Sequence, residues 1–277
     1  MTASSLNNKA TNTAFILVSE HGIRGAIIDL TDDNVGFLPE TKKGSLLPSD
    51  LASEIIGYMR EHAIGDIDIY VPVLPGLMSD DNVTALSRML KMRRHDAMVM
   101  PVSDLLAYGV WDRRGKALDD AKERRAWALN SRMIMMFMDG KRALLSMVDS
   151  GRIISRLSLD DDLYKPFDSR NDSPAERILH GVSLSRIDSW VRRVFSPVSV
   201  VYYMTGGEPG TAFSQTHETI RSSDIMDDLA QAAKSLDLSK SGLPDFISGG
   251  RDDFDDLIIS LPDEHGREHS YPIFQHE

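Results

Sequence analysis

Apolar and β-branched residues open the chain in three short runs, at residues 14–18, 23–30 and 35–38. Polar turn residues separate these runs, which predicts three consecutive strands joined by tight connections. The spacing of the apolar residues within 51–59 then predicts a helix that begins at Ser49 or Asp50. A strand at 67–73, a helix at 79–90, a strand at 97–102 and a helical stretch from Ser103 to Asn130 follow.

The same order of elements recurs in the second half of the chain. Three strands are expected at 133–138, 143–148 and 152–159, followed by a helix that starts near Ser173, a strand at 198–204 and a helix near Ser223. A repeated order of this kind predicts an α/β protein with two similar lobes around a central cleft. We expect a disordered leader at 1–12, lobes at 13–130 and 131–240, and an acidic, loosely packed segment at 241–277.

Composition narrows the possible functions. The chain has 277 residues, 42% of them hydrophobic, a formal net charge of −11 and no cysteine. The acidic balance argues against nucleic acid as a partner, and the absence of cysteine excludes disulfides and thiolate metal sites. No run reaches the roughly 18 apolar residues of a membrane span, and residues 1–12 lack a basic leader and an apolar signal core. We therefore expect a cytoplasmic protein.

Charge is unevenly distributed along the chain. Basic residues are dense between Lys91 and Arg132, whereas the last third is rich in aspartate. This pattern predicts either solvated helix faces of opposite sign or a basic docking surface for an acidic protein partner or a sister subunit. The arginines assigned to such a surface are Arg113, Arg114, Arg124 and Arg125.

Several familiar site motifs are absent or incomplete. The chain has no Gly-x-Gly-x-x-Gly after its first strand, no P-loop and no Gly-x-Ser-x-Gly elbow. Residues 265–269 match His-x-x-Glu-His, but an internal glycine and flanking prolines oppose the helix that this zinc motif needs. The aspartate clusters at 160–162 and 252–256 lack calcium-loop spacing, and we interpret them as solvated loops. We interpret the methionine-rich stretch 133–138 as core.

The strand Ile23–Asp29, which follows Gly22 and contains Arg24, resembles part of the phosphate-binding hairpin of the actin/hexokinase/Hsp70 ATPase superfamily. The nearest branch is that of bacterial glucokinase and ROK sugar kinases. The resemblance implies that Gly22 and Arg24 contribute to a phosphate site. It places the family's Gly-Gly-Thr on residues 19–21 and its metal-associated aspartate on Leu17, which has no oxygen ligand to offer.

Three further stretches carry the resemblance. Gly140 to Gly151 is similar in spacing to the second phosphate hairpin, so that Gly140, Lys141 and Arg142 would bind anions, although Ala143 to Leu145 fill positions of small residues. Pro101-Val102-Ser103-Asp104 resembles the family's Val-Asn-Asp, whose aspartate is the base for the sugar hydroxyl. Asp104 is thus either this base or a helix N-cap. Val200 to Gly207 resembles the strand and glycines that contact adenosine, which implies Gly206 and Gly207.

These departures favour a degenerate sugar-kinase-like or actin-like ATPase fold that acts in binding, assembly or regulation. Two alternatives remain open at this point. One is an active ATP-dependent sugar or small-molecule kinase with Asp104 as base, for which ATP and Mg²⁺ are the implied cofactors. The other is an unrelated α/β interaction protein without a nucleotide site.

Overall fold

The computed structural model describes residues 12–42, 44–65, 67–74, 76–93, 97–138, 143–159, 184–189, 191–193, 199–205, 218–236, 258–262 and 268–272. The chain forms two compact units. The first comprises residues 1–102 and 229–238, and the second comprises residues 103–228 and 239–277. Residues 1–11 and 160–176 lie outside the described residues, as do residues 241–277 except for 258–262 and 268–272.

A mixed five-stranded sheet of order β3-β2-β1-β4-β5 forms the centre of the first unit. Its strands are β1 (Asn12–Val18), β2 (Ile23–Asp29), β3 (Asn34–Phe37), β4 (Asp68–Val73) and β5 (Ala97–Pro101). Antiparallel pairing joins β1 to β2 and β2 to β3, whereas β1, β4 and β5 pair in parallel. All five strands lie where the hydrophobic pattern predicted them.

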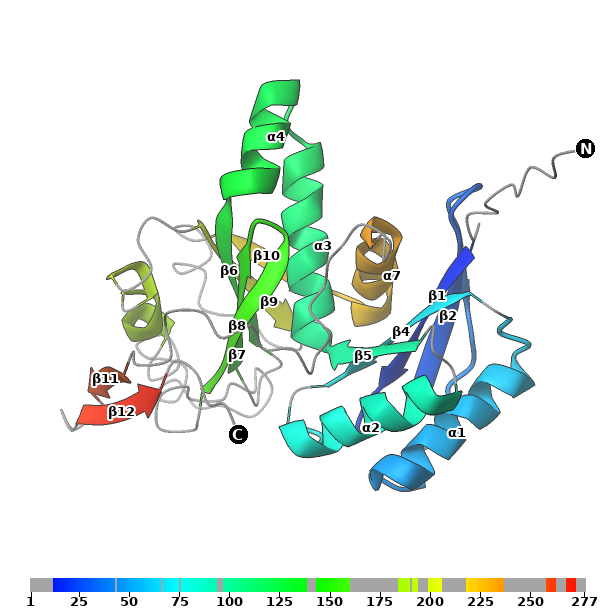
Figure 1. Ribbon diagram of the computed structural model, residues 1–277. Coiled ribbons are helices and arrows are strands. Elements are labelled where there is room, and N and C mark those ends of the chain that lie inside the picture. The colour runs from blue at the N-terminus through cyan, green and yellow to red at the C-terminus, as the bar shows by residue number, and fades with distance from the viewer. Residues whose placement is uncertain are drawn as a thin grey trace, which may run out of the picture. The chain divides into compact units, whose positions relative to one another are not determined.

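Helices α1 (Pro48–Glu61) and α2 (Asp80–Arg93) lie side by side in the first unit (Figure 1). A proline within the first turn of α1 suits a helix start, because its missing N–H would have no helical acceptor there. Leu51 and Ile55, one turn apart, are fully buried, as the helical spacing predicted. Arg93 in the last turn of α2 donates a 3.0 Å hydrogen bond to Ser53 of α1, which ties the two helices together.

The C-terminal part of α7 (Ile225–Ser235) also belongs to the first unit. The Lys234 ammonium lies 2.7 Å from a carboxylate oxygen of Asp33, in the β2–β3 turn. The Tyr70 hydroxyl on β4 also donates a 3.4 Å hydrogen bond to the Leu236 carbonyl. A segment from late in the sequence is thus held against the N-terminal sheet.

The second unit repeats the topology of the first, with strand order β10-β9-β6-β7-β8. Its strands are β6 (Arg132–Met138), β7 (Ala143–Asp149), β8 (Arg152–Leu159), β9 (Ser199–Thr205) and β10 (Thr219–Ser222). Again the first three pair antiparallel, and β9 and β10 are parallel to β6. The predicted duplication is confirmed, although the four-residue β10, which lacks an apolar run, was missed.

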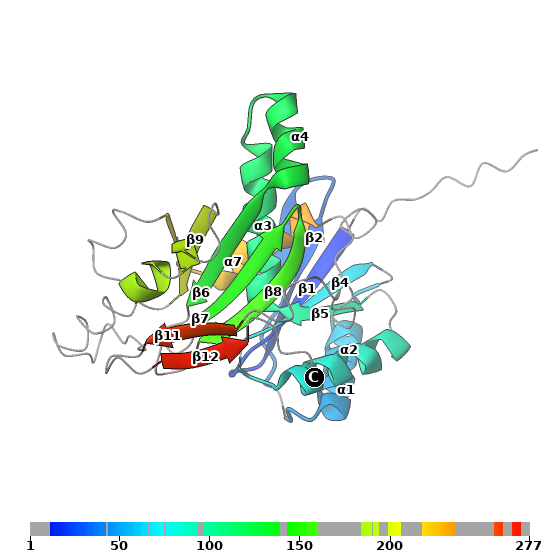
Figure 2. The same ribbon diagram turned by 60° about the vertical axis from the view of Figure 1, so that its left-hand side comes forward.

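Two helices expected in the first lobe lie with the second sheet instead. Helix α3 (Val102–Lys116) and helix α4 (Ala121–Asn130) belong to the second unit. The side chains of Asp104 and Arg114 on α3 form hydrogen bonds with residues of β7 and β9, respectively, which connects this helix to the second sheet. Both views show α3 beside the second sheet and α4 beyond the end of β6 (Figures 1 and 2).

Strand β6 confirms the interpretation of the methionine-rich stretch as core. Met133, Met135, Met136 and Met138 are all at most 1% exposed. Flexible thioether side chains fill irregular space well, which suits a central strand covered on both faces. A separate two-stranded sheet pairs β11 (Ile258–Pro262) with β12 (Glu268–Pro272). In the part of the chain that is described, no helix has the length and apolarity to cross a membrane.

Candidate functional site

The β1–β2 turn, where the resemblance predicts a phosphate hairpin, is closed by its own serine. The Ser19 hydroxyl oxygen accepts hydrogen bonds from the backbone N–H groups of His21 and Gly22, each at 3.2 Å. The backbone N–H of Ser19 donates to the Gly22 carbonyl at 2.9 Å. A turn binds phosphate through N–H groups that point outward without acceptors. Here Ser19, His21 and Gly22 already use their N–H groups within the turn.

Gly22 has a packing role that differs from the expected one. A Cβ atom at this position would lie 2.3 Å from the carbonyl oxygen of Thr41, so no side chain fits. Ile23 and Thr41 exchange backbone hydrogen bonds of 2.8 and 2.9 Å directly beside it. The glycine therefore permits the close approach of residue 41 to the start of β2.

A buried tyrosine fixes the same segment against β2. The Tyr58 hydroxyl accepts a 2.9 Å hydrogen bond from the Gly25 N–H and donates one of 2.9 Å to the Pro39 carbonyl. Burial raises the pKa of Tyr58, so the phenol stays neutral and able to donate. Residues 38–41 are thus held beside the β2 strand by contacts at both ends.

Leu17 and Arg24 face each other across the β1–β2 ladder. Leu17 is buried at 5% exposure, and Arg24 is half-buried. Leu17 brings no oxygen to the place where the resemblance expects a metal-associated aspartate. Among the described residues, no group of three His, Asp or Glu side chains could hold a metal ion. Leu17 therefore offers Mg²⁺ no ligand here, and the N–H groups of Ser19, His21 and Gly22 are already bonded within the turn.

The second expected phosphate hairpin is described only in part. Gly140, Lys141 and Arg142 lie outside the described residues. Ala143 and Leu145 are buried in β7, opposite Met138 and Met136 of β6. The residues that replace the family's small ones are thus ordinary strand residues of the core.

Gly151 closes the other end of this hairpin in a two-residue turn. Its φ is +80°, and the preceding Ser150 has a φ of +50°. A Cβ atom on Gly151 would lie 2.8 Å from the Trp111 ring. The position therefore requires glycine for its backbone conformation and also for the close approach of the indole.

Asp104 is 4% exposed and lies in the first turn of α3, two residues after its start. It is therefore a first-turn residue and not the N-cap. One carboxylate oxygen accepts a 3.1 Å hydrogen bond from the Ser146 hydroxyl, and the other accepts one of 2.6 Å from Arg156 Nε. Arg156 Nη2 also pairs with that second oxygen. Both oxygens of the expected base thus have partners inside the second unit.

Gly206 and Gly207, the expected adenosine contacts, lie outside the described residues, but the strand before them is described. Tyr202 of β9 donates a hydrogen bond to Asp188, which also accepts from Arg192 at 2.9 Å. Neighbouring Tyr203 donates to Asp228 of α7 at 2.6 Å. Successive strand side chains point to opposite faces, so each face of β9 is tied to a helix. Sequence reasoning missed these pairs, although Asp188 and Arg192 have the i, i+4 spacing of a helical ion pair.

The two β9 tyrosines predict a loss of stability in alkali. Burial, and next the hydrogen bonds to Asp188 and Asp228, raise the pKa values of Tyr202 and Tyr203 far above the usual range. Above pH ~10 the unfolded chain releases both phenolic protons while the folded chain keeps them, so the free energy of unfolding falls by up to ~1.4 kcal/mol per pH unit for each tyrosine. Urea unfolding at several pH values should show this slope, and Tyr202→Phe should reduce it. An unchanged slope in the variant would contradict the assignment.

The four arginines expected to bind a partner divide into two pairs. Within the second unit, Arg114 donates a hydrogen bond to Ser199 and forms an ion pair with Glu218. Arg124 donates to the Leu118 carbonyl at 2.7 Å and to the Asp119 carbonyl at 3.1 Å. Arg113 and Arg125 are exposed. The structure thus uses half of the expected docking residues for intramolecular contacts.

Comparison with known proteins identifies the fold. No protein-family model and no curated protein sequence matches the chain. Among solved structures, the ROK hexokinase from Thermus thermophilus is similar, with a TM-score of 0.51 and 13% identity over 82% of this chain and 98% of that one. MreB5 of Spiroplasma citri bound to ADP is similar with a TM-score of 0.48 and 9% identity, over 84% of this chain and 98% of that one.

A Bacteroides thetaiotaomicron protein of unknown function, described as having an actin-like ATPase fold, is also similar. Its TM-score is 0.44 and its identity 11%, over 82% of this chain and 96% of that one. The likeness to the hexokinase and the duplicated sheets show that this chain has the fold of the actin/hexokinase/Hsp70 superfamily. At this level of identity the likeness defines the fold and leaves the activity to be argued from the site.

Proposed function

We propose that the chain is a degenerate sugar-kinase-like or actin-like ATPase-fold protein that acts in binding, assembly or regulation and not in catalysis. The observation that carries this proposal is the β1–β2 turn, in which the Ser19 hydroxyl accepts the N–H groups of His21 and Gly22. An incoming phosphate oxygen would have to displace that hydroxyl to reach either N–H. A protein partner, and no nucleic acid, is the proposed ligand class in a cytoplasmic setting.

Two further features support a loss of catalysis. Leu17 stands where a metal-associated carboxylate would be expected, and it is buried among apolar residues of β1. Asp104, the residue that would take a proton from a sugar hydroxyl, is nearly inaccessible and forms an ion pair with Arg156. A general base must reach its substrate proton within hydrogen-bond distance, and both oxygens of this carboxylate already have other donors.

Thermal unfolding with and without Mg-ATP tests the proposal. A ligand present at 100 times its dissociation constant adds ~2.7 kcal/mol of stability, which would raise the melting temperature by several degrees. We expect no rise with millimolar Mg-ATP and no hexose-dependent ADP release above a blank, whereas an active ROK-type hexokinase assayed in parallel should show both. Sugar-dependent ADP release that Asp104→Asn abolishes in a folded variant would overturn the proposal and favour the kinase.

A further inference from the structure

Strand β3 forms an edge of the first sheet, and in the described part of the chain β2 is its only strand neighbour. The backbone N–H of Leu38 donates to the Gly25 carbonyl at 2.8 Å, so Gly25 and the alternate β2 residues 27 and 29 direct their backbone groups toward β3. In an antiparallel ladder the intervening residues point the other way. The backbone N–H and C=O groups of Val35 and Phe37 therefore face away from β2, where another strand can pair with them.

The side chains of β3 make this edge apolar on one face. Val35 and Phe37 lie opposite Ile28 and Ala26, so these four residues share one face of the sheet. Ile28 and Ala26 are fully buried, whereas Val35 is half-buried and Phe37 is 43% exposed. The buried apolar face of β2 thus continues to the edge of the sheet and ends there in a phenylalanine ring that a further strand could cover.

The other edge strands of the two five-stranded sheets carry the usual protection against pairing. β8 contains Arg152 and Arg156, β10 contains Arg221, and β5 ends at Pro101 and is buried or half-buried throughout. Charged side chains and proline are the common means by which a sheet edge avoids pairing with other chains. Residues Asn34 to Phe37 include neither a charge nor a proline. The β3 edge therefore remains able to pair.

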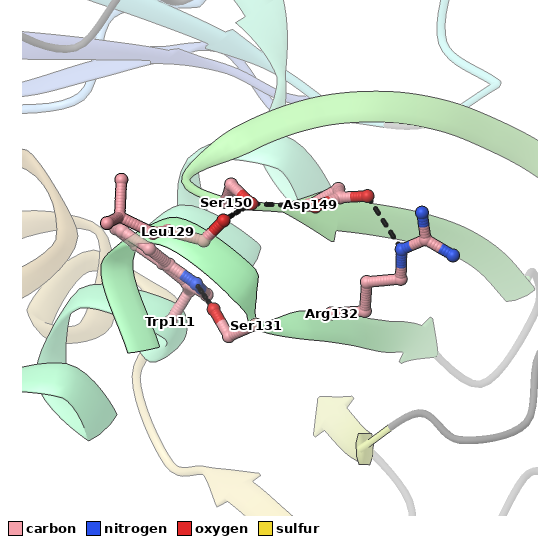
Figure 3. Close-up of polar contacts among 6 residues, drawn as sticks. All are labelled: Trp111, Leu129, Ser131, Arg132, Asp149 and Ser150. Atoms are coloured by element: carbon pink, nitrogen blue, oxygen red, sulfur yellow. Dashed lines mark hydrogen bonds and ion pairs between the residues drawn. The ribbon is translucent and has the colours of Figure 1, made fainter. Parts of the chain in front are cut away.

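The turn that leads into the edge strand also differs between the two units. In the second unit the β7–β8 turn contacts the end of α4, because the Ser150 hydroxyl donates to the Leu129 carbonyl at 2.8 Å (Figure 3). Trp111 and Ser131 join the same region with a 2.6 Å hydrogen bond. In the first unit Leu30, at the start of the β2–β3 turn, is 45% exposed. The duplicated fold thus covers one of two equivalent turns and leaves apolar surface at the other.

The charge near the start of β3 is negative. Asp29 ends β2, and Asp32 and Asp33 are exposed in the turn that follows. Hydrogen bonds from the backbone N–H groups of Thr31 and Asp32 lower the pKa of Asp29, so this carboxylate is ionised at neutral pH. Lys234 pairs with Asp33 and offsets one of the three charges. A basic residue near this end of β3 would therefore favour the binding of an added strand.

We infer that the β3 edge binds an extended segment of a protein partner that adds as a strand and carries a lysine or arginine, an inference that rests on the proposed binding function. Backbone hydrogen bonds to Val35 and Phe37 supply the pairing, and an apolar side chain of the segment covers the Phe37 ring. The basic residue lies beside Asp32, about four residues from the apolar one, because paired strands match residue for residue. A second copy is a poorer occupant, since antiparallel pairing of β3 with itself about Gly36 would bring Asp32 and Glu40 of different copies together.

Selection from a phage library of random peptides of about twelve residues, with the full chain as the immobilised target, tests this docking site. We expect enriched peptides with alternating apolar residues and a lysine or arginine. Titration calorimetry with synthetic copies of these peptides should show tighter binding at about 50 mM than at about 500 mM salt. Val35→Pro removes the outward N–H and places a ring on the open edge, so it should weaken binding by about tenfold or more. Bound peptide should also slow amide hydrogen exchange at Val35 and Phe37.

Two variants control for the change at Val35. Gly36→Ala alters the same strand, but its Cβ atom would meet only the Ile27 carbonyl oxygen, at 3.8 Å, so it should bind the peptides like the unmodified chain. Asp32→Asn removes one exposed charge beside the strand, and it should weaken binding by about two- to fivefold and reduce the salt dependence. Proline is tolerated at an edge position whose N–H faces outward. Should Val35→Pro nevertheless fail to fold, Asp32→Asn and the exchange rates still test the inference.

Three results would overturn the inference. Enriched peptides that bind the Val35→Pro chain unchanged would lie elsewhere on the surface, and a selection that enriches no peptide would show that the edge does not dock one. Slow exchange at Val35 and Phe37 in the chain alone would indicate an edge that is already covered, by another copy or by the chain itself. Failure here is distinct from failure of the proposed function, because sugar-dependent ADP release together with peptide binding would reject the loss of catalysis and retain the docking edge.

Discussion

Replacing Arg156 with methionine is expected to lower the free energy of unfolding by about 3–5 kcal/mol, because it leaves a buried carboxylate without its cation. Asp104 is 4% exposed, and after the change the Ser146 hydroxyl would be its remaining side-chain donor among the described residues. Methionine keeps most of the apolar stem, so the loss reports mainly on the charge. Urea or guanidinium unfolding followed by tryptophan fluorescence measures the difference.

Arg132→Met is the matched control for this experiment. Arg132 Nε lies 2.7 Å from an Asp149 carboxylate oxygen, a geometry close to that of Arg156 and Asp104. Both side chains of the control pair are considerably more solvated, at 55% and 24% exposure. An exposed pair contributes ~0–1 kcal/mol. If both variants lost the same free energy of unfolding, burial of Asp104 would not be the cause of the loss in Arg156→Met.

Trp111→Ala should also lower the free energy of unfolding strongly, by about 3–5 kcal/mol, because it removes a buried aromatic side chain from a packed region. The indole is 9% exposed, contacts Gly151, stacks on Trp127 and donates to Ser131. Its removal should also free the end of α4. Limited trypsin digestion should then cut faster at Lys122 and Arg125 under conditions in which most of the chain is folded.

Two further variants serve as controls for Trp111→Ala. Trp111→Phe keeps a ring but removes the hydrogen bond to Ser131, so a smaller loss of ~1 kcal/mol is expected. Leu129→Ala alters an exposed residue of the same region and should change stability by less than ~0.5 kcal/mol. Unchanged tryptic cleavage within α4 in Trp111→Ala would contradict the role of the indole as the anchor of that helix.

Much of the fold could be predicted from local hydrophobic patterns. Runs such as 14–18 and 133–138 are apolar on both faces, which identifies central strands, and the spacing of Leu51 and Ile55 identifies α1. Strand β10 was missed because it is short and lies at a sheet edge, where burial leaves little pattern. The assignment of α3 and α4 to the second unit also escaped prediction, since it depends on contacts such as that between Arg114 and Ser199, 85 positions apart.

At the candidate site, the sequence alone identified Leu17 in place of a carboxylate and the bulky residues after Gly140. It also offered a signal for the closed turn that was not used. A serine followed by a polar turn and a glycine favours a side-chain hydrogen bond to nearby N–H groups, as Ser19 makes. No comparable local signal marks Arg156 as the partner of Asp104, because 52 positions separate them. The register of β7 and β8 places Arg156 opposite Ser146, and Asp104 of α3 meets both side chains.

The sequence by itself thus determined the order of elements, its duplication and the chemical types present at each turn, because these depend on periodicities of two to four residues. The tertiary structure decided which of these groups are used in contacts within the chain and which remain available to a ligand or a partner. It showed that Thr41 approaches Gly22, that Asp104 is paired with Arg156, and that Arg124, although exposed, donates to the Leu118 carbonyl. Availability depends on sheet register and helix packing, which bring together residues distant in the chain and cannot be read from the spacing of neighbouring residues.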